Sequence, residues 1–231
     1  MSDSRTAIIV GAGRGLSASL ARRFAAGGAR LALACRNPSK LDALCAETGA
    51  RAFACDATRP GDVAALFDGT DALFGAPNIA VYNASARARG PVSELDPEEV
   101  KAALIGSAYG AFLVAQQAAR RMLAAGSGTI LLTGASASVK GYPNSAPFAM
   151  GKFALRGLAE SLARELQPEN VHVAHFVIDG AIRNPGRTEP PDRPDSMLDP
   201  DAIAETYWQV ANQDRSAWTF EVALRPWVEK F

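Results

Sequence analysis

Three glycines follow the first apolar segment of the chain, in the run Gly11–Ser17 (Gly-Ala-Gly-Arg-Gly-Leu-Ser). The five residues before this run are mostly apolar, and leucine or phenylalanine then recurs at positions 16, 20 and 24. These patterns predict a buried strand followed by an amphipathic helix. Glycines let a backbone approach a phosphate closely, and the N-terminus of a helix supplies free N–H groups and the positive end of a dipole. The run therefore predicts a loop that binds the diphosphate of a dinucleotide, with a ligand-free tight turn as the alternative.

Apolar segments and helical segments alternate along the rest of the chain. The predicted strands are 6–10, 30–35, 50–55, 79–82, 129–133, 171–178 and 218–224. The predicted helices are 16–26, 38–48, 62–67, 97–122, 147–166 and 201–211. Strands that are apolar throughout, each followed by a helix, are typical of a parallel sheet covered on both faces. We predict a single-domain α/β Rossmann fold over residues 1–231, with a doubly wound parallel sheet and helices on both faces.

The segment 183–200 is the longest stretch without a helical or strand pattern. It contains five prolines, from Pro185 to Pro200. A connection of this length is unusual within a compact domain. Because it follows the end of a strand, where open α/β sheets bind ligands, we predict a substrate lid. A loosely ordered loop is the alternative.

Composition limits the partners and the compartment. The 24 basic and 24 acidic residues cancel, so neither nucleic acid nor a membrane surface is expected as a partner. No apolar run approaches the roughly 20 residues that span a bilayer, and the N-terminus shows no secretory signal. Three scattered cysteines and two histidines make a metal site unexpected. We predict a cytoplasmic protein acting on a small molecule.

Two arginines bear on which dinucleotide the loop binds. Arg14 lies within the glycine run, and Arg36 directly follows the second predicted strand. A site for NAD usually has an acidic residue near the end of that strand, where it binds the ribose 2′-hydroxyl, and none is present here. Arginines suit the 2′-phosphate of NADP. We therefore predict NADP(H) as cofactor, with NAD(H) less favoured; a solvated loop charge is the alternative for Arg36.

Taken together, these motifs resemble the short-chain dehydrogenase/reductase family over nearly the whole chain. The glycine run looks like that family's glycine motif, with Ser17 where a third glycine is usual. Asp56-Ala57 resembles the acidic pair that contacts adenine, and Asn83-Ala84 matches half of the family's Asn-Asn-Ala-Gly. Asp179-Gly180-Ala-Ile182 stands in place of Pro-Gly-x-Val/Ile. The cofactor-binding residues that the resemblance implies are Gly11, Gly13, Arg14, Gly15, Leu16, Arg36, Asp56, Ala57, Asn83, Ala84, Lys152, Gly180 and Ile182.

The same resemblance places the catalytic positions. In this family a tyrosine exchanges the proton of the carbinol oxygen, a lysine one helical turn later lowers the tyrosine pKa, a serine orients the carbonyl, and an asparagine completes a water relay. Lys152 stands at the lysine position, but the tyrosine position is Phe148 and the asparagine position is Ser107. Ala135 falls at the serine position, with Ser136 one residue later. The chain is thus identified with an atypical subgroup whose implied catalytic residues are Lys152, Ser136, Phe148 and Ser107.

Phe148 leaves several functions open, because a phenyl ring has no proton to transfer. The first is an NADP(H)-dependent oxidoreductase with a fairly apolar carbonyl or alcohol substrate, in which another hydroxyl donates the proton. The nearby hydroxyls in sequence are those of Ser136, Ser138, Ser145, Tyr109 and Tyr142. The second uses water as the proton source. The third is a protein that binds NADP(H) without catalysis, as a sensor or subunit, and a methyltransferase with a similar loop is a further alternative.

The two long helices also suggest an assembly. The segments 97–122 and 147–166 are rich in alanine and leucine on more than one face. In the family that this chain resembles, the equivalent helices form a four-helix contact between subunits. The resemblance therefore implies a homodimer or homotetramer.

Overall fold

The computed structural model describes residues 5–229. Its main sheet has seven strands in the order β3-β2-β1-β4-β5-β6-β9, and every neighbouring pair is parallel. The strands are β1 (Thr6–Val10), β2 (Arg30–Cys35), β3 (Arg51–Ala54), β4 (Ile79–Tyr82), β5 (Gly128–Thr133), β6 (Val171–Ile178) and β9 (Glu221–Leu224). The doubly wound parallel sheet predicted from the sequence is confirmed.

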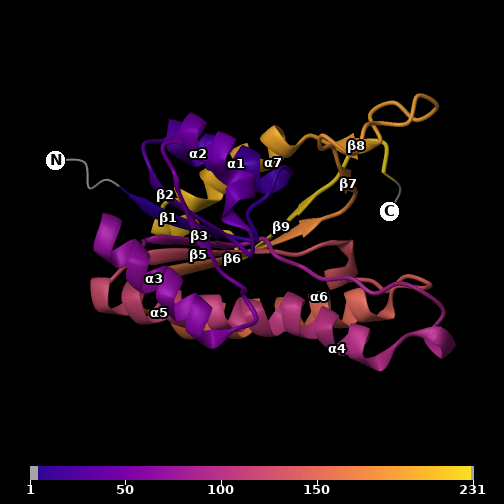
Figure 1. Cartoon of the computed structure of the whole chain (residues 1–231), viewed down its shortest axis with the longest axis horizontal. Coiled ribbons are helices and arrows are strands. Elements are labelled where there is room, and N and C mark those ends of the chain that lie inside the picture. The colour runs from indigo at the N-terminus through magenta and orange to yellow at the C-terminus, as the bar shows by residue number, and fades with distance from the viewer. Residues whose placement is uncertain (1–4, 230–231) are drawn as a thin grey trace.

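Helices cover both faces of this sheet (Figure 1). The helices are α1 (Leu16–Ala26), α2 (Asp42–Thr48), α3 (Pro60–Phe74), α4 (Pro97–Leu104), α5 (Gly110–Ala125), α6 (Ala146–Leu166) and α7 (Pro200–Ala211). One core lies between the sheet and α1, α2 and α7, and the other between the sheet and α3, α5 and α6. Neighbouring strand residues such as Ile8 and Ile9 belong to opposite cores, because successive side chains point to opposite faces. This two-sided burial explains why the strands are apolar throughout.

Several elements differ from their predicted bounds. Helix α3 extends to Phe74 rather than ending near Phe67, because Thr70 continues past Gly69 the buried stripe that Val63 and Leu66 begin. The predicted helix 97–122 is one long helix with a π turn at Ile105–Tyr109 between α4 and α5. Strand β9 begins only at Glu221, since a short helical turn occupies Arg215–Ala217.

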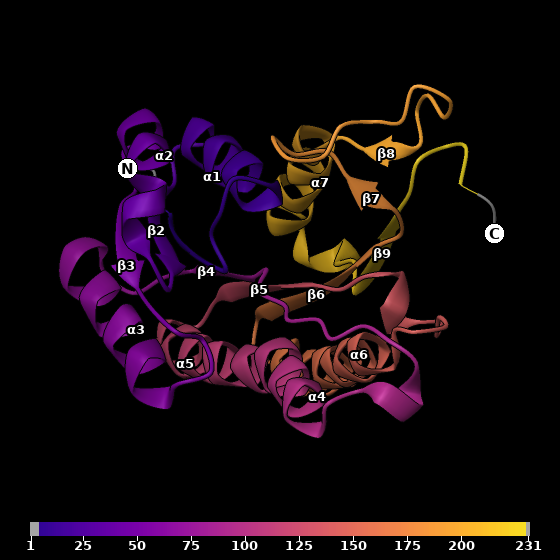
Figure 2. The same ribbon diagram turned by 45° about the vertical axis from the view of Figure 1, so that its right-hand side comes forward.

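The segment predicted as a lid is anchored at both ends. Strands β7 (Ala181–Ile182) and β8 (Met197–Leu198) pair in parallel as a separate small sheet. Residues 183–196 form the excursion between them and extend beyond β7 and β8 (Figure 2). Pro200 belongs to α7 rather than to the loop. The segment is therefore an extended loop held by a two-stranded clasp.

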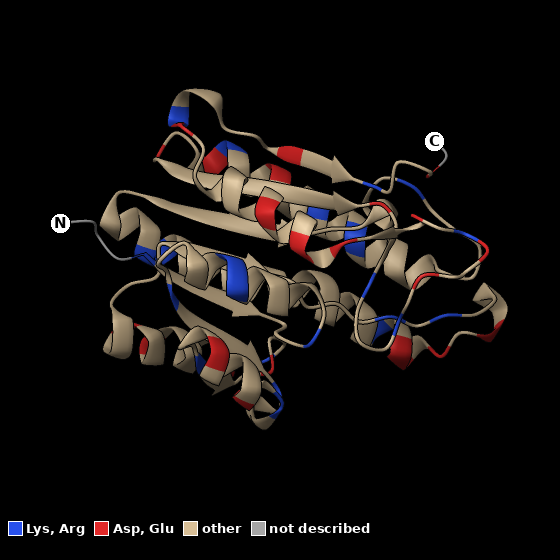
Figure 3. Ribbon diagram, turned by 90° about the horizontal axis from the view of Figure 1, so that it is seen from above, with Lys and Arg blue, Asp and Glu red and all other residues tan. Residues whose placement is uncertain are grey.

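The continuous helix Pro97–Ala125 is the one described segment long and apolar enough to cross a membrane, by length and composition alone. This finding differs from the expectation that no run approaches that length, because small residues such as alanine raise the mean hydropathy of the helix. Core helices of soluble proteins meet the same criterion. Within α5, Ala111, Val114 and Ala118 are buried in the core below the sheet. Seen from above, acidic and basic residues are interspersed over the helices and loops (Figure 3).

Candidate functional site

The glycine run lies where the strand order reverses, because β1 pairs with β2 on one side and with β4 on the other. Gly11 has a φ of +85°, and a Cβ atom placed on it would lie 2.5 Å from the backbone nitrogen of Ala84. Only glycine accepts both this conformation and this close approach. Helix α1 begins at Leu16 without a side-chain cap at Gly15. The N–H groups of its first turn are therefore suited to a phosphate.

Ser17, at the position of the usual third glycine, is hydrogen-bonded within the loop. Its hydroxyl donates to the carbonyl oxygen of Gly11 at 2.9 Å and accepts from the Nδ2 atom of Asn83 at 2.7 Å. The side chain is 2% exposed. Ser17 thus connects the glycine run to the end of β4, and it leaves the turn intact. This use of Asn83 was not anticipated from the sequence.

A cleft of about 620 Å³ opens on one side of the glycine run, and we call it the β2–β3 compartment. Its walls include Gly11, Arg36, Asp56, Ala57 and Ala84, all of which were predicted to bind cofactor. Thr58 donates to Asp56 through its backbone N–H at 3.0 Å and its hydroxyl at 2.7 Å, and these bonds hold the pKa of Asp56 below its ordinary value. The arginine and the carboxylate thus flank a compartment roomy enough for a nucleoside.

A second cleft of about 260 Å³, which we call the β5–β6 compartment, lies on the other side. The predicted residues that line it are Gly15, Leu16, Asn83, Phe148, Lys152, Gly180 and Ile182. Ser85 borders both compartments, so the two are neighbours along the carboxyl edge of the sheet. Two adjoining compartments with a phosphate loop between them fit a dinucleotide.

Lys152 is buried at the floor of the β5–β6 compartment, with 3% of its surface exposed. Its Nζ atom donates to the carbonyl oxygen of Thr133 at 2.7 Å. Burial, reinforced by the charge of Arg87, lowers the pKa of Lys152 to about 7. Ammonium and amine forms are therefore both populated near neutral pH.

Phe148 lines the same compartment and packs with Ala135 and Ala137. The guanidinium of Arg87 lies over its ring, with Cζ 3.9 Å from the ring centroid. Partial burial and the neighbouring charges of Arg89 and Arg187 lower the pKa of Arg87 from its ordinary value. The side chain of Arg87 thus covers one face of the Phe148 ring, and Phe148 is the residue at the predicted tyrosine position.

The other two predicted catalytic residues lie outside the lining of both compartments. Ser107 is fully buried on the π turn, and its hydroxyl lies 3.4 Å from both the backbone nitrogen and the carbonyl oxygen of Ala86. It therefore supports the segment that carries Ser85 and Arg87. Ser136 begins a helical turn, and the lining is formed by Gly134 and Ala135 before it.

None of the hydroxyls proposed from the sequence as proton donors lines the β5–β6 compartment. Ser138 is buried and accepts from the backbone N–H of Ala135, and Tyr109 and Tyr142 are more than 40% exposed. Among the described residues, Ser85 alone brings a side-chain hydroxyl to the lining. Sequence reasoning did not single out Ser85 as a donor.

Arg14 and Gly13 complete the predicted set. Both lie in sequence between residues that border the two compartments, and neither lines a compartment itself.

Sequence reasoning missed Arg87, Asn184 and Arg187, which all line the β5–β6 compartment. The available signal for Arg87 was its place four residues after Asn83, at the carboxyl end of a central strand.

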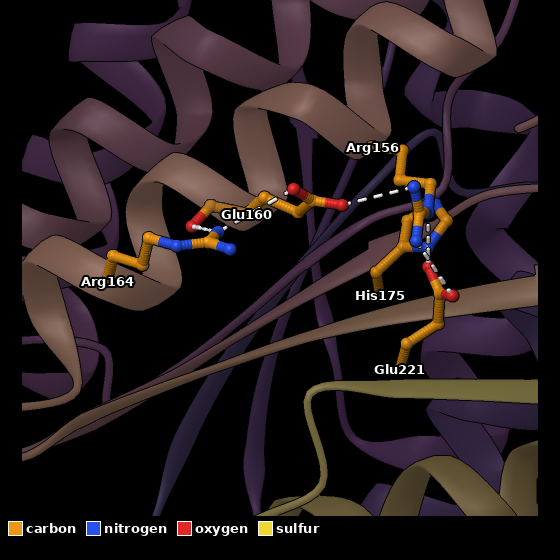
Figure 4. A network of polar contacts seen from close by, with 5 residues as sticks. All are labelled: Arg156, Glu160, Arg164, His175 and Glu221. Carbon is orange, nitrogen blue, oxygen red and sulfur yellow. Dashed lines mark hydrogen bonds and ion pairs between the residues drawn. The ribbon is translucent and has the colours of Figure 1, made fainter.

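A polar network that runs from buried His175 to exposed Arg164 holds the helix that carries Phe148 and Lys152 (Figure 4). Nδ1 of His175 lies 2.9 Å from Glu221, which binds Arg156 of α6 at 2.7 Å. Arg156 and Arg164 flank Glu160 on the same helix at 3.0 and 3.6 Å. Burial lowers the pKa of His175 despite Glu221, so this histidine is neutral at pH 7 and donates through Nδ1. The network ties α6 to β6 and β9.

Within residues 5–229, no group of three or more His, Cys, Asp or Glu side chains is placed to hold a metal ion.

The family model for short chain dehydrogenases matches residues 5–188. The chain belongs to this family. A D-threitol dehydrogenase of Mycolicibacterium smegmatis is 31% identical over 176 residues, which cover 74% of this chain and 68% of that protein. The predicted family is thereby confirmed, and the methyltransferase alternative is set aside.

Solved structures agree with this assignment. A short-chain dehydrogenase from Rhodopseudomonas palustris is 36% identical, with a TM-score of 0.83 over 96% of this chain and 99% of that chain. A metagenomic short-chain oxidoreductase solved in complex with NADP is 28% identical, with a TM-score of 0.84 over 97% of this chain and 99% of that chain. Relatives of this short-chain dehydrogenase are thus oxidoreductases. Its place in a subgroup with phenylalanine for tyrosine stays a prediction.

Proposed function

We propose that this short-chain dehydrogenase uses NADP(H) to interconvert a small carbonyl compound and its alcohol. The observation that carries the proposal is Arg36, which follows β2 on the wall of the β2–β3 compartment, where a carboxylate would select NAD. A guanidinium at this place suits the 2′-phosphate of NADP. We further propose that residues 1–231 form one domain, because the strand ends of the main sheet and the loop 183–196 both contribute residues to the β5–β6 compartment.

The chain's own residues divide the binding between them. Gly11, Gly13, Gly15 and Leu16 would hold the diphosphate, and Arg14 and Arg36 would hold the 2′-phosphate. Asp56 and Ala57 would hold the adenosine end, and Asn83, Ala84, Lys152, Gly180 and Ile182 would hold the nicotinamide end. When bound, NADP(H) supplies or accepts the hydride. Phe148, Ala135 and Ile178 form an apolar wall against which the reacting carbon lies.

The proton has to come from another group than residue 148. Lys152 lines the compartment, and its pKa of about 7 gives a proton donor and an acceptor in comparable amounts at neutral pH. A general acid works best when its pKa lies near the working pH. We assign Lys152 and a water molecule to proton exchange with the substrate oxygen. Ser107 and Ser136 position the surrounding segments.

Calorimetric titration with NADPH and with NADH tests the cofactor. We expect wild-type protein to prefer NADPH, and Arg36→Ala to weaken NADPH by about tenfold or more while NADH changes little, since a charged hydrogen bond contributes about 1.5–3 kcal/mol. Arg51→Ala, an exposed arginine of β3 outside the lining, is the matched control. Equal losses for both cofactors would contradict NADP selection, and binding of neither would overturn the proposal.

The second candidate function is cofactor binding without turnover. It is favoured by one observation, that the described lining has Phe148 and Ala135 where the family has two hydroxyl groups. Such a sensor or subunit binds NADPH normally and oxidises none of it with any carbonyl compound. A broad screen of ketones, aldehydes and oxo acids separates the two functions.

We also propose a homodimer or homotetramer formed through α5 and α6. Phe112 and Tyr109 on one helix, and Met150 and Phe153 on the other, expose between 41 and 50% of their surfaces. Large apolar groups gathered on two neighbouring helices are suited to contact with a second copy. The cytoplasmic location stays a prediction.

A further inference from the structure

The β5–β6 compartment collects positive charge. Arg87, Lys152 and Arg187 line it, and no aspartate or glutamate is among the described residues of its lining. Two of these cations come from loops far apart in the sequence, one after β4 and one from the excursion between β7 and β8. Such an arrangement concentrates charge of one sign in a small space.

Three acidic residues on the segments that carry the β7–β8 clasp are engaged with other groups. Asp179 lies 3.7 Å from Lys140 and 3.9 Å from Arg225. Glu189 accepts from the backbone N–H of Met197, and Asp199 pairs with Arg183 at 2.6 Å. No ion pair found within residues 5–229 includes Arg87 or Arg187. Both guanidinium groups thus lack a carboxylate partner in the described part of the chain.

The stacking of Arg87 on Phe148 prepares it for an anion. A guanidinium that lies on an aromatic face keeps its N–H donors in the plane, where they match the two oxygens of a carboxylate. Its proximity to Arg89 and Arg187 is unfavourable as long as no anion is near. A carboxylate between Arg87 and Arg187 offsets that repulsion. The ring of Phe148 thereby serves as a support for the arginine.

We propose that the β5–β6 compartment takes a small carboxylate-bearing substrate, an oxo acid or hydroxy acid, whose carboxylate binds Arg87. This inference rests on the proposed function. It revises the expectation of a fairly apolar substrate, because that expectation was based on the phenyl ring of Phe148 alone, and the structure places the guanidinium of Arg87 over the ring. A compartment of about 260 Å³ that also receives the nicotinamide leaves room for an acid of a few carbon atoms.

A cofactor phosphate is the other source of an anion here. The glycine run, the N-terminus of α1 and Arg36 already provide for the cofactor phosphates. Asn184, whose backbone pairs with that of Arg187, places its Cβ atom 3.9 Å from a Cβ atom built on Gly15, so the Arg187 segment approaches the glycine run. We therefore assign Arg87 to the substrate carboxylate, and the experiment separates the two arginines.

The test is calorimetric binding of oxamate, malonate and benzoate, each compared with its neutral amide. The full-length protein is titrated with and without saturating NADP⁺, and the NADPH dissociation constant is measured for every variant. We expect at least one of the carboxylates to bind and its amide not to bind. Arg87→Gln should weaken that carboxylate at least tenfold and leave NADPH binding unchanged, with Arg87→Lys in between. Arg89→Gln removes the same charge from the same loop outside the lining, and we expect it to behave like wild type.

Three results would overturn the inference. One is that none of the three carboxylates binds wild-type protein. Another is equal carboxylate binding by wild type and Arg87→Gln. The third is that Arg87→Gln weakens NADPH and spares the carboxylate, which would assign the arginine to a cofactor phosphate. If the wild-type protein binds no NADPH, the proposed function is overturned. Carboxylate binding to the cofactor-free protein then still decides the inference on Arg87.

Discussion

The two compartments on either side of the glycine run differ in how closely they follow the family that they belong to. In the β2–β3 compartment, Gly11, Asp56 and Ala57 stand where the family pattern expects them. In the β5–β6 compartment, Lys152 stands at the predicted lysine position, Phe148 and Ala135 stand where the resemblance places two hydroxyls, and Arg87 lies on the phenyl ring at 3.9 Å. We therefore expect separate groups of residues to bind the nucleotide and to act on the substrate. Ser17 departs from the family pattern in the first group, but the departures that remove reactive groups lie in the second.

The difference shows which constraints are steric and which are chemical. Gly11 is fixed by a close approach between two backbones, and any side chain there disturbs β1 and β4 together. Phenylalanine has nearly the volume of tyrosine, so we expect Phe148 to preserve the fold while lacking the proton that a tyrosine would donate. We therefore expect a departure in the β5–β6 compartment to alter the reaction before it alters the structure.

The largest effect is expected at Gly11. Gly11→Ala places a Cβ atom 2.5 Å from the backbone of Ala84 at a φ of +85°, so we expect a stability loss of more than about 2 kcal/mol and no measurable NADPH binding. Gly13→Ala is the matched control, since its Cβ atom meets no protein atom within 4 Å. We expect Gly13→Ala to keep wild-type stability in urea unfolding. If both variants were equally stable, the steric interpretation of the β2–β3 side would be wrong.

The next effect concerns the missing hydroxyls. Phe148→Tyr combined with Ala135→Ser restores both groups, and we expect carbonyl reduction to rise about tenfold to a hundredfold, since general acid catalysis contributes about 10²–10⁴. The measurement is the decrease in NADPH absorbance with a panel of ketones, aldehydes and oxo acids as substrates. Phe153→Tyr adds a hydroxyl to an exposed residue of the same helix and should change nothing. An unchanged rate in the double variant would show that the two compartments differ in more than these hydroxyls.

A third prediction uses the titration of Lys152. Its pKa is about 7 in the folded protein and near 10.4 when the chain is unfolded, so the unfolded state binds more protons between these values. Stability therefore rises with pH in this window, by about 1.4 kcal/mol per unit, and the penalty is fully present below pH 7. From pH 7.5 to 9, wild type should gain about 2 kcal/mol relative to Lys152→Met in chemical unfolding. Parallel curves for the two proteins would contradict a neutral buried lysine, and Lys101→Met, at an exposed site, is the control.

The smallest effect on either compartment is expected from the assembly. Phe153→Glu places a charge on the exposed apolar surface of α5 and α6, and light scattering should then report a smaller species. NADPH affinity should stay within about threefold, since the side chain of Phe153 lines neither compartment. Val92→Glu, on an apolar side chain that is 81% exposed elsewhere, should leave the mass unchanged. An unchanged mass for Phe153→Glu would place the subunit contact on another surface.

The local sequence pattern was sufficient to predict most of the fold. Apolar strands, helical periodicity and the proline at the start of α4 depend on neighbours in the sequence, and their predicted positions agree with the structure. Helix α4, for example, begins at Pro97 as predicted, and the side chain of Asp96 before it accepts from the N–H of Glu98. The extent of α3 was underestimated, since the helix predicted to end near Phe67 continues through Gly69 to Phe74.

The sequence by itself determined the strand–glycine-run–helix pattern and the family, and from these it predicted the cofactor-binding strand ends and the replacement of the tyrosine by Phe148, because each depends on residue type at a fixed distance from a strand or helix end. Only the tertiary structure decided where the charges meet. Arg87 and Phe148 are 61 residues apart, and no local pattern encodes the stacking of one on the other. The burial that lowers the pKa of Lys152 likewise arises from packing around α6, so the substrate side of the site became interpretable only once the chain was folded.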